Sequence, residues 1–406
     1  MRRQAAAPAE TARVSGRAAD VMMPTRRPFW QRVGVMSLAH FANDLSAAYL
    51  GPLLPLVVTK FSLSLTLAGL LGTVFSISSA LGQPLFGLAS DRLTRPVFAF
   101  VGPLLTTVMM GLLGVAPSYG VMVGLLVLAG IGTAAFHPQA FGLAGALSED
   151  RRGAGLSIFV AGGEFGYSLG PVFVAALVAT LGLPGTMVAA LPGLVACAVV
   201  WWTIREWQVV RAPAAGGLRG DVRQHGRAFA LIWFIVVARS VIILAHITFI
   251  PLLLREQGES LILGGTAVFM FGGIGTIGGL VGGTLSDRIG RRAVLAISMA
   301  ASAPLLLLFG RLSGALALLP LALGGFTMFL GAPVAIVMAQ EMVPHRASLA
   351  SSVVTGLAWG TAGLSLTLIG AAADRIGLAP TLALTLVLAL PALAATWALP
   401  AHPAED

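Results

Sequence analysis

Long apolar runs alternate with short polar stretches along the chain, and this alternation is the first signal of its structure. Each run has about 20 residues or more, the length that an α-helix needs to cross the hydrocarbon core of a bilayer. The polar stretches are rich in Arg, Asp, Pro and Gly, as loops at a membrane surface are. The pattern predicts an all-α, polytopic membrane protein with twelve transmembrane helices, at 33–58, 65–90, 96–116, 119–146, 153–181, 184–204, 228–255, 262–286, 292–311, 313–342, 347–372 and 378–399.

The predicted spans fall into two halves with matching landmarks. Pro138 and Pro333 occupy equivalent places in the two halves, and so do Gly162 and Gly356. A repeat of half the chain predicts two pseudo-symmetric six-helix bundles. The predicted divisions are a disordered, basic cytoplasmic tail (1–32), an N-terminal bundle (33–204), a cytoplasmic linker (205–227), a C-terminal bundle (228–399) and a cytoplasmic tail (400–406).

Composition supports a membrane protein and excludes a nucleic-acid partner. Hydrophobic residues make up 57% of the chain and charged residues 10%, which is more apolar surface than a soluble core of this size can hide. The net charge of +9 comes mostly from loops on one side of the predicted spans. That asymmetry follows the positive-inside rule, so both termini are expected on the cytoplasmic side of the membrane. The expected membrane is a bacterial inner membrane. The single cysteine, Cys197, excludes an intramolecular disulfide.

One loop motif occurs in both halves. Gly283–Arg292 reads Gly-Thr-Leu-Ser-Asp-Arg-Ile-Gly-Arg-Arg, and Gly87–Arg95 reads Gly-Leu-Ala-Ser-Asp-Arg-Leu-Thr-Arg. The glycine lets another helix come close, and the carboxylate can sit at a neighbouring helix N-terminus. The arginines stay with water and anionic headgroups.

The motif resembles the loop signature of the major facilitator superfamily, and the first copy departs from it at Thr94 and Pro96. The resemblance implies that the halves are related by an axis along the membrane normal, that the substrate site lies between them, and that they rock in alternating access. It also implies a gating role for Gly87, Asp91, Arg92, Arg95, Gly283, Asp287, Arg288, Gly290 and Arg291.

Polar residues inside the spans are the main functional signal, because charge within a bilayer is costly. Counting along each span places Asp44, His137, Glu164 and Arg239 at a similar depth, about 15 Å from the cytoplasmic side. Asp44, Glu164 and His137 are therefore the candidate carriers of a coupled proton. The candidate substrate-binding residues are His40, Asn43, Tyr167, Ser168, Arg239 and His246.

Structural roles remain open for the same residues. Asp44 or Glu164 could pair with Arg239 and hold the halves together. The ring of His137 could satisfy carbonyls freed by the proline that follows it. Glu341 is expected to form a salt bridge at the inner surface.

The fifth span carries two distinct faces. Gly162, Gly166 and Gly170 form a small-residue seam for close packing, and Glu164, Tyr167, Ser168 and Pro171 lie roughly opposite. The sequence Gly166-x-x-x-Gly170-Pro171 resembles the antiporter motif of proton-coupled exporters, with Val174 in place of its last glycine. Leu126 stands where many drug exporters carry an arginine.

Four further stretches resemble the fosmidomycin-resistance branch of the superfamily, namely Leu38–Asp44, Phe136–Gln139, Ser157–Pro171 and Ala339–Pro344. The resemblance implies proton-coupled efflux of a small drug-like or anionic metabolite such as fosmidomycin. The expected partners are that small molecule, protons and the lipid bilayer, with no cofactor beyond the proton gradient, and the protein is expected to be a monomer.

Two other functions stay open. The same fold can serve a uniporter or proton symporter of a sugar or organic acid, or a non-transporting membrane receptor or scaffold. An enzyme is not expected, because the sequence shows no metal-ligand spacing, nucleotide loop or nucleophile arrangement. Gly273–Gly278 resembles a dinucleotide fingerprint in letters only, since no strand precedes it.

Overall fold

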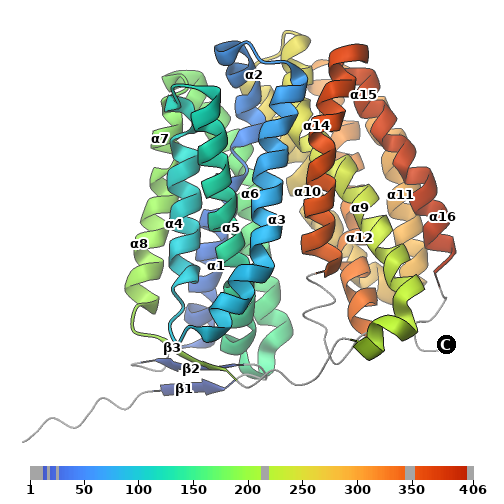
Figure 1. The fold of residues 1–406 in the computed structure, drawn as a ribbon. Helices are drawn as coiled ribbons and strands as arrows, with labels where there is room; N and C mark the ends of the chain where they lie inside the picture. Colours follow the sequence, from blue (N-terminus) through green and yellow to red (C-terminus); the bar gives the residue numbers. More distant parts are fainter. Residues whose placement is uncertain (1–11, 16–18, 24–26, 212–218, 343–352, 400–406) are drawn as a thin grey trace, which may run out of the picture.

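The structure, a computed structural model, describes residues 12–15, 19–23, 27–211, 219–342 and 353–399. Two helical bundles stand side by side (Figure 1). Within the described residues, 11 helical segments are long and apolar enough to cross a membrane. The predicted fold class is confirmed, since a bilayer offers no water to the backbone and helices satisfy every amide internally.

The N-terminal bundle begins with a broken span, in which α1 and α2 are separated at Ala48 and Tyr49. Ser64 and Ser118 start two of its helices by accepting hydrogen bonds from the amides of Leu67 and Val121. Its elements are α1 (Phe29–Ala47), α2 (Leu50–Phe61), α3 (Leu65–Arg92), α4 (Phe98–Gly111), η1 (Leu113–Val115), α5 (Tyr119–Leu147), η2 (Glu149–Arg151), α6 (Arg152–Leu181), α7 (Gly185–Ala189) and α8 (Leu191–Ile204).

The C-terminal bundle repeats this plan. The predicted span 347–372 corresponds to a π-helical turn followed by α14, and its first residues lie outside the described part of the chain. The elements are α9 (Arg219–Glu256), α10 (Leu261–Ile289), α11 (Arg291–Phe309), η3 (Gly314–Ala317), α12 (Leu318–Met342), η5 (Val353–Leu357), α14 (Ala358–Ile376), α15 (Leu378–Thr385), η6 (Leu386–Leu388) and α16 (Ala389–Trp397).

The tail and the linker predicted from the sequence both contribute strands. The strands β1 (Ala12–Ser15), β2 (Ala19–Met23) and β3 (Gln208–Arg211) form an antiparallel sheet in the order β1-β2-β3. The prediction of disorder over 1–32 is therefore wrong for β1, β2 and the start of α1, and the linker prediction is wrong for β3 and for 219–227, which belong to α9. The tail 400–406 lies outside the described residues.

Burial of apolar side chains explains this sheet. Val21 and Met23 on β2 are buried in one cluster with Leu143 and Leu147 at the end of α5. Trp207, next to β3, is buried in the same cluster. The sheet is thus held by the end of the N-terminal bundle, which supplies the apolar surface that an isolated hairpin lacks.

The two bundles are joined near one end. Hydrogen bonds between described residues of the two bundles link the first half of α3 to the middle and end of α14. The Asp374 carboxylate accepts from the amides of Leu65 and Thr66 at 2.7 and 2.9 Å. Further along, Thr73 donates to the Gly363 carbonyl at 2.7 Å. Figure 1 shows the bundles closest at the α2 end and further apart toward the sheet.

Candidate functional site

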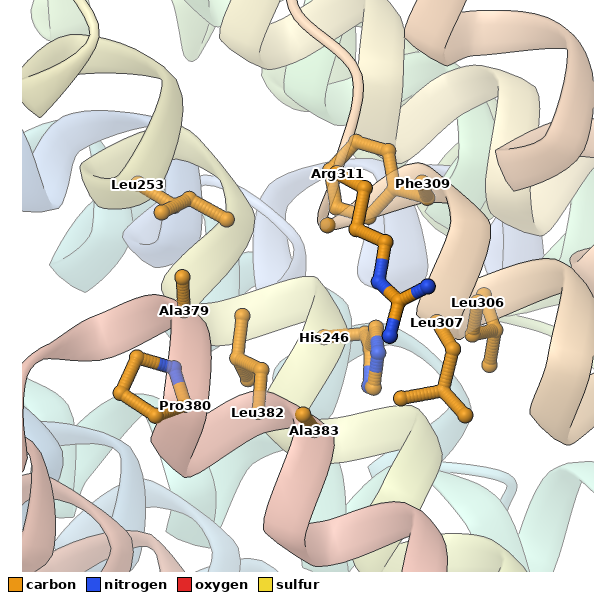
Figure 2. Close-up of a pocket in the computed structure, with 11 residues that line it drawn as sticks. His246, Leu253, Leu306, Leu307, Phe309, Arg311, Ala379, Pro380, Leu382 and Ala383 are labelled. Atoms are coloured by element: carbon orange, nitrogen blue, oxygen red, sulfur yellow. The ribbon is translucent and has the colours of Figure 1, made fainter.

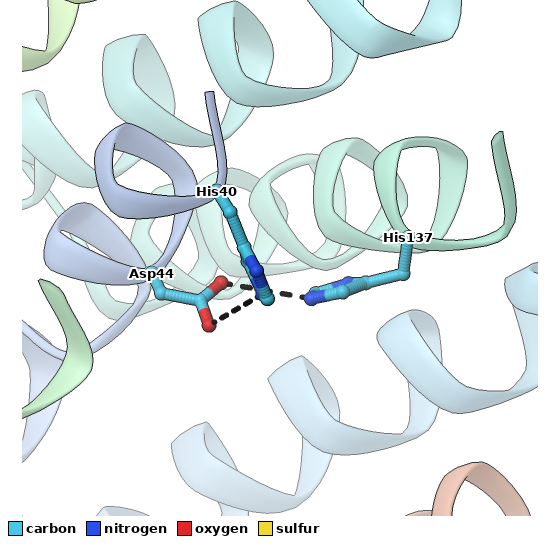
Figure 3. A group of neighbouring side chains, drawn as sticks. All are labelled: His40, Asp44 and His137. Atoms are coloured by element: carbon cyan, nitrogen blue, oxygen red, sulfur yellow. Dashed lines mark ion pairs between the residues drawn. The ribbon is translucent and has the colours of Figure 1, made fainter. Parts of the chain in front are cut away.

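Two histidines and an aspartate from two helices meet inside the N-terminal bundle (Figure 3). His40 and Asp44 lie one turn apart on α1, with His40 Nε2 at 3.2 Å from Asp44 Oδ2. His137 comes from α5, and its Nε2 lies 3.6 Å from Asp44 Oδ1. We call these three residues the His-Asp cluster.

Backbone carbonyls set the orientation of both rings. His40 Nδ1 donates to the Phe159 carbonyl at 2.9 Å, and His137 Nδ1 donates to the Thr133 carbonyl at 3.0 Å. A carbonyl can only accept, so each Nδ1 carries a hydrogen and, in a neutral ring, Nε2 presents a lone pair. Both lone pairs would then face the Asp44 carboxylate. This arrangement favours a bound positive charge, which can be a proton or another cation.

The cluster depends on the close approach of α6 to α1. A Cβ at Gly163 would overlap the imidazole of His40, so only glycine leaves room for the ring. Gly166 and Gly170 lie directly against the α1 backbone. The glycine seam therefore lets α6 pack at backbone contact with the helix that carries Asp44.

His137 is held at both ring nitrogens. Its Nδ1 donates to the carbonyl of Thr133 one turn earlier in α5, whereas the carbonyl that loses its amide donor to Pro138 is that of Ala134, so the structural alternative is not met. Its Nε2 faces Asp44. One ring nitrogen is thus a structural anchor, and the other belongs to the cluster.

Glu164 lies beside the His-Asp cluster without joining its hydrogen bonds. It is half-buried on α6 and within electrostatic range of Asp44 and His40. Tyr167, one turn further on, is within range of both carboxylates. Among the described residues, no ion-pair partner faces the Glu164 carboxylate. A titratable acid without a counter-ion therefore adjoins the cluster.

Asn43 and Ser168 are the two remaining candidate residues on α1 and α6. Asn43 is fully buried and donates from Nδ2 to Asp44 Oδ1 at 2.8 Å. Ser168 is buried on α6, and a Cβ at Gly272 of α10 would lie 3.3 Å from its hydroxyl. Ser168 thus lies where the two bundles touch.

Arg239 is not part of this group, although the sequence places it at a similar depth. Its side chain is 3% exposed and donates from Nη2 to the Met328 carbonyl of α12 at 2.7 Å. Among the described residues no carboxylate pairs with it, so the alternative pairing with Asp44 or Glu164 is wrong here. The guanidinium ties α9 to α12 within the C-terminal bundle.

His246 also lies apart from the cluster, in a separate pocket of about 220 Å³ (Figure 2). Its Nδ1 donates to the Ile242 carbonyl at 2.8 Å. Arg311 reaches toward it from the end of α11, and the remaining walls are mainly leucine, alanine and proline side chains.

The second copy of the loop motif forms a three-helix ion network. Arg291 at the start of α11 binds Glu341 of α12 at 2.6 Å and Asp287 of α10 at 3.3 Å. Gly290, between α10 and α11, has φ of +90°, which favours glycine. The first copy has Thr94 at this place, and its α3 ends instead in an extended Leu93.

The first copy is tied to α5. Gln139 donates from Nε2 to the Ser90 hydroxyl at 3.2 Å and accepts from the Ala99 amide at 2.9 Å. A Cβ at Gly87 of α3 would contact Pro138 of α5, and one at Gly283 of α10 would contact Pro333 of α12. The two halves therefore share this helix–helix contact.

Sequence reasoning missed two features of this site. It found no metal-ligand spacing, yet three ligand atoms of the His-Asp cluster lie within 4.8 Å of one another. The signal for two of them, His40 and Asp44 at i and i+4, was visible. It also missed Asp374 as a partner of α3, because nothing in a sequence pairs distant helix ends.

Comparison with known proteins gives matches over most of the chain. The sequence model of the Major Facilitator Superfamily matches residues 36–365. YfnC of Bacillus subtilis (strain 168), an uncharacterized MFS-type transporter, is 28% identical over 367 residues, covering 86% of this chain and 88% of that protein. The fosmidomycin resistance protein of Escherichia coli (strain K12) is 28% identical over 350 residues, covering 84% and 86%. The resemblance inferred from the sequence motifs is confirmed.

Solved structures share the fold. A bacterial homologue of the human lysosomal transporter Spinster, inward-facing and unoccupied, matches with a TM-score of 0.79 at 16% identity, covering 92% of this chain and 98% of that one. The inward-facing and occupied form matches with a TM-score of 0.75 at 17% identity, covering 92% and 97%.

Proposed function

Because this chain belongs to the major facilitator superfamily, we propose that it exports a small drug-like or anionic molecule in exchange for protons. The chain is a multi-pass transporter of the alternating-access type. The substrate class is suggested by the relative named for fosmidomycin resistance. Fosmidomycin is an anionic phosphonate, and the imidazoles of His40 and His137 could bind such a group when they are protonated.

The observation that carries proton coupling is the placement of Glu164. Its carboxylate lies beside Asp44 and His40 on the helix that packs against α1, with no ion-pair partner among the described residues. A carboxyl group in that position can take up a proton from one side of the membrane and release it on the other as the bundles rock. Asp44 and His137 are the alternative carriers.

The direction of opening follows from the charge distribution. Basic loops on the side of the termini support an orientation with that side facing the cytoplasm and the protein in a bacterial inner membrane. The joined end, where Asp374 binds Leu65 and Thr66, then faces outward. In this orientation the end at which the ribbons of the two bundles lie further apart faces the cytoplasm (Figure 1), which supports the uptake of a substrate for export from that side. We propose that the protein works in this way as a monomer.

The test is proton flux in liposomes. Purified protein is reconstituted with a pH-sensitive dye inside, a proton gradient is imposed, and fosmidomycin is added to wild type, Glu164→Gln and Glu256→Gln. Glu256 is an exposed glutamate at the end of α9 and serves as the matched control. Drug-dependent proton flux in wild type and control, lost in Glu164→Gln, is the expected result.

The other outcomes separate the alternatives. Flux retained in Glu164→Gln would assign the proton to Asp44 or His137. Drug uptake without any proton movement would indicate a uniporter, and the absence of both with every compound tried would favour a receptor or scaffold.

A further inference from the structure

The His-Asp cluster has the spacing of a metal site. In tetrahedral zinc sites with bonds of about 2.0–2.2 Å, neighbouring ligand atoms are roughly 3.3 Å apart. The Nε2 atoms of His40 and His137 lie 3.2 and 3.6 Å from the two oxygens of Asp44. All three ligand atoms fall within 4.8 Å of one another. Only small side-chain shifts separate this geometry from coordination.

The surroundings of the ligands are also those of a metal site. Metal-binding histidines usually donate their second ring hydrogen to a carbonyl or carboxylate, which fixes the tautomer that coordinates. Both histidines do so here, to the carbonyls of Phe159 and Thr133. Asn43 in turn donates to the Asp44 carboxylate and orients it. Two Nε2 lone pairs and a carboxylate therefore point at one space without a hydrogen-bond donor between them.

From this arrangement we propose that His40, Asp44 and His137 bind a divalent transition-metal ion such as Zn²⁺. Two imidazoles and one carboxylate suit Zn²⁺, Ni²⁺ or Cu²⁺, whereas Mg²⁺ and Ca²⁺ prefer oxygen ligands alone. Three protein ligands leave a fourth position for water. The side chains of Asp44 and His137 are 18% and 19% exposed, so an ion has access to them.

The bound ion would act on transport by holding α1 against α5 and by adding positive charge beside Glu164. Both helices belong to the N-terminal bundle, so the ion does not lock the two bundles together. It occupies the space next to the proposed proton carrier and is expected to inhibit proton-coupled flux. The inhibition of proton-coupled flux depends on the proposed function, whereas the binding of the ion does not.

Binding is tested directly on purified protein in detergent, carrying a purification tag without histidine. Competition with a zinc-chelating dye gives the stoichiometry and the dissociation constant, and Co²⁺ absorption reports the ligand geometry. We expect one Zn²⁺ per chain in wild type. Loss of a residue that only hydrogen-bonds a metal ligand already weakens metal sites about 10–100-fold. His40→Gln, Asp44→Asn and His137→Gln remove a ligand itself, so each should weaken binding by at least about 100-fold.

Two control variants make the result specific. His246→Gln removes another buried histidine and Glu164→Gln removes the neighbouring carboxylate, and both should still bind one ion. Equal affinity in wild type and the three cluster variants would overturn the proposal, and so would the absence of a stoichiometric ion in wild type. Because Glu164→Gln is expected to bind metal while losing proton flux, failure of the metal site and failure of the proposed function are told apart.

Discussion

His137 Nε2 faces Asp44 Oδ1 at 3.6 Å across the contact between α5 and α1. The same ring is anchored through Nδ1 to the Thr133 carbonyl, so its orientation does not depend on Asp44. A change at Asp44 should therefore leave the ring in place and alter only the charge that it faces.

The first prediction concerns the space beside the cluster. In Gly163→Ala the added methyl overlaps the His40 ring, and overpacking of this kind typically costs about 1–3 kcal/mol. We expect a lower melting temperature in detergent together with loss of transport. Gly142→Ala on α5 is the control, because nothing lies within 4 Å of its Cβ. Unchanged stability and transport in Gly163→Ala would show that α6 does not pack on α1 as described.

The second prediction concerns the joined end of the bundles. Asp374 caps the start of α3, and loss of a cap costs about 0.5–2 kcal/mol, so Asp374→Ala should shift the conformational balance about 2–30-fold toward opening at this end. Distances between spin labels at the exposed Leu67 and Leu368 would report it, with the buried Cys197 replaced by serine. Thr66→Ala removes only the hydroxyl contact and should have a smaller effect. An unchanged distance distribution in Asp374→Ala would contradict the capping role.

The third prediction concerns the ion network of the second loop motif. Arg291 binds Asp287 and Glu341 at the same time. Asp287→Asn and Glu341→Gln should therefore both lower the population of the described conformation. Exposed ion pairs contribute about 0–1 kcal/mol, which limits each shift to about fivefold. Cysteine-accessibility labelling at both ends measures it, with Glu206→Gln as the control for an exposed pair. Opposite shifts in the two variants would show that the motif residues act independently.

The fourth prediction concerns Arg239. Removing its side chain deletes a buried hydrogen bond from a charged group, and such a bond contributes about 1.5–3 kcal/mol. Arg239→Ala should therefore lower stability and reduce transport of anionic and cationic compounds alike. The exposed Arg255→Ala is the control. A loss confined to anionic compounds would instead place Arg239 in the substrate path.

Much of the fold could be predicted from local sequence patterns. Apolar runs of sufficient length have one stable backbone conformation in a bilayer, so the helices and their approximate ends follow from hydropathy alone. The repeat was visible as well, because Gly87 with Pro138 and Gly283 with Pro333 keep the same helix contact in both halves. The strand β2 was missed because its alternation is short and acquires meaning only when Val21 and Met23 meet α5.

The chain by itself determined the membrane helices, the duplicated halves and the depth of each polar residue, because these depend on length and local composition. It did not determine which polar residues meet. The depth of a residue in the membrane does not determine how its helix is rotated or which helices lie next to it. Arg239 and His137 were therefore equal candidates to face Asp44. Only the tertiary structure separated them: the glycine seam of α6 draws α1 into the N-terminal bundle beside α5, while Arg239 binds Met328 in the other bundle.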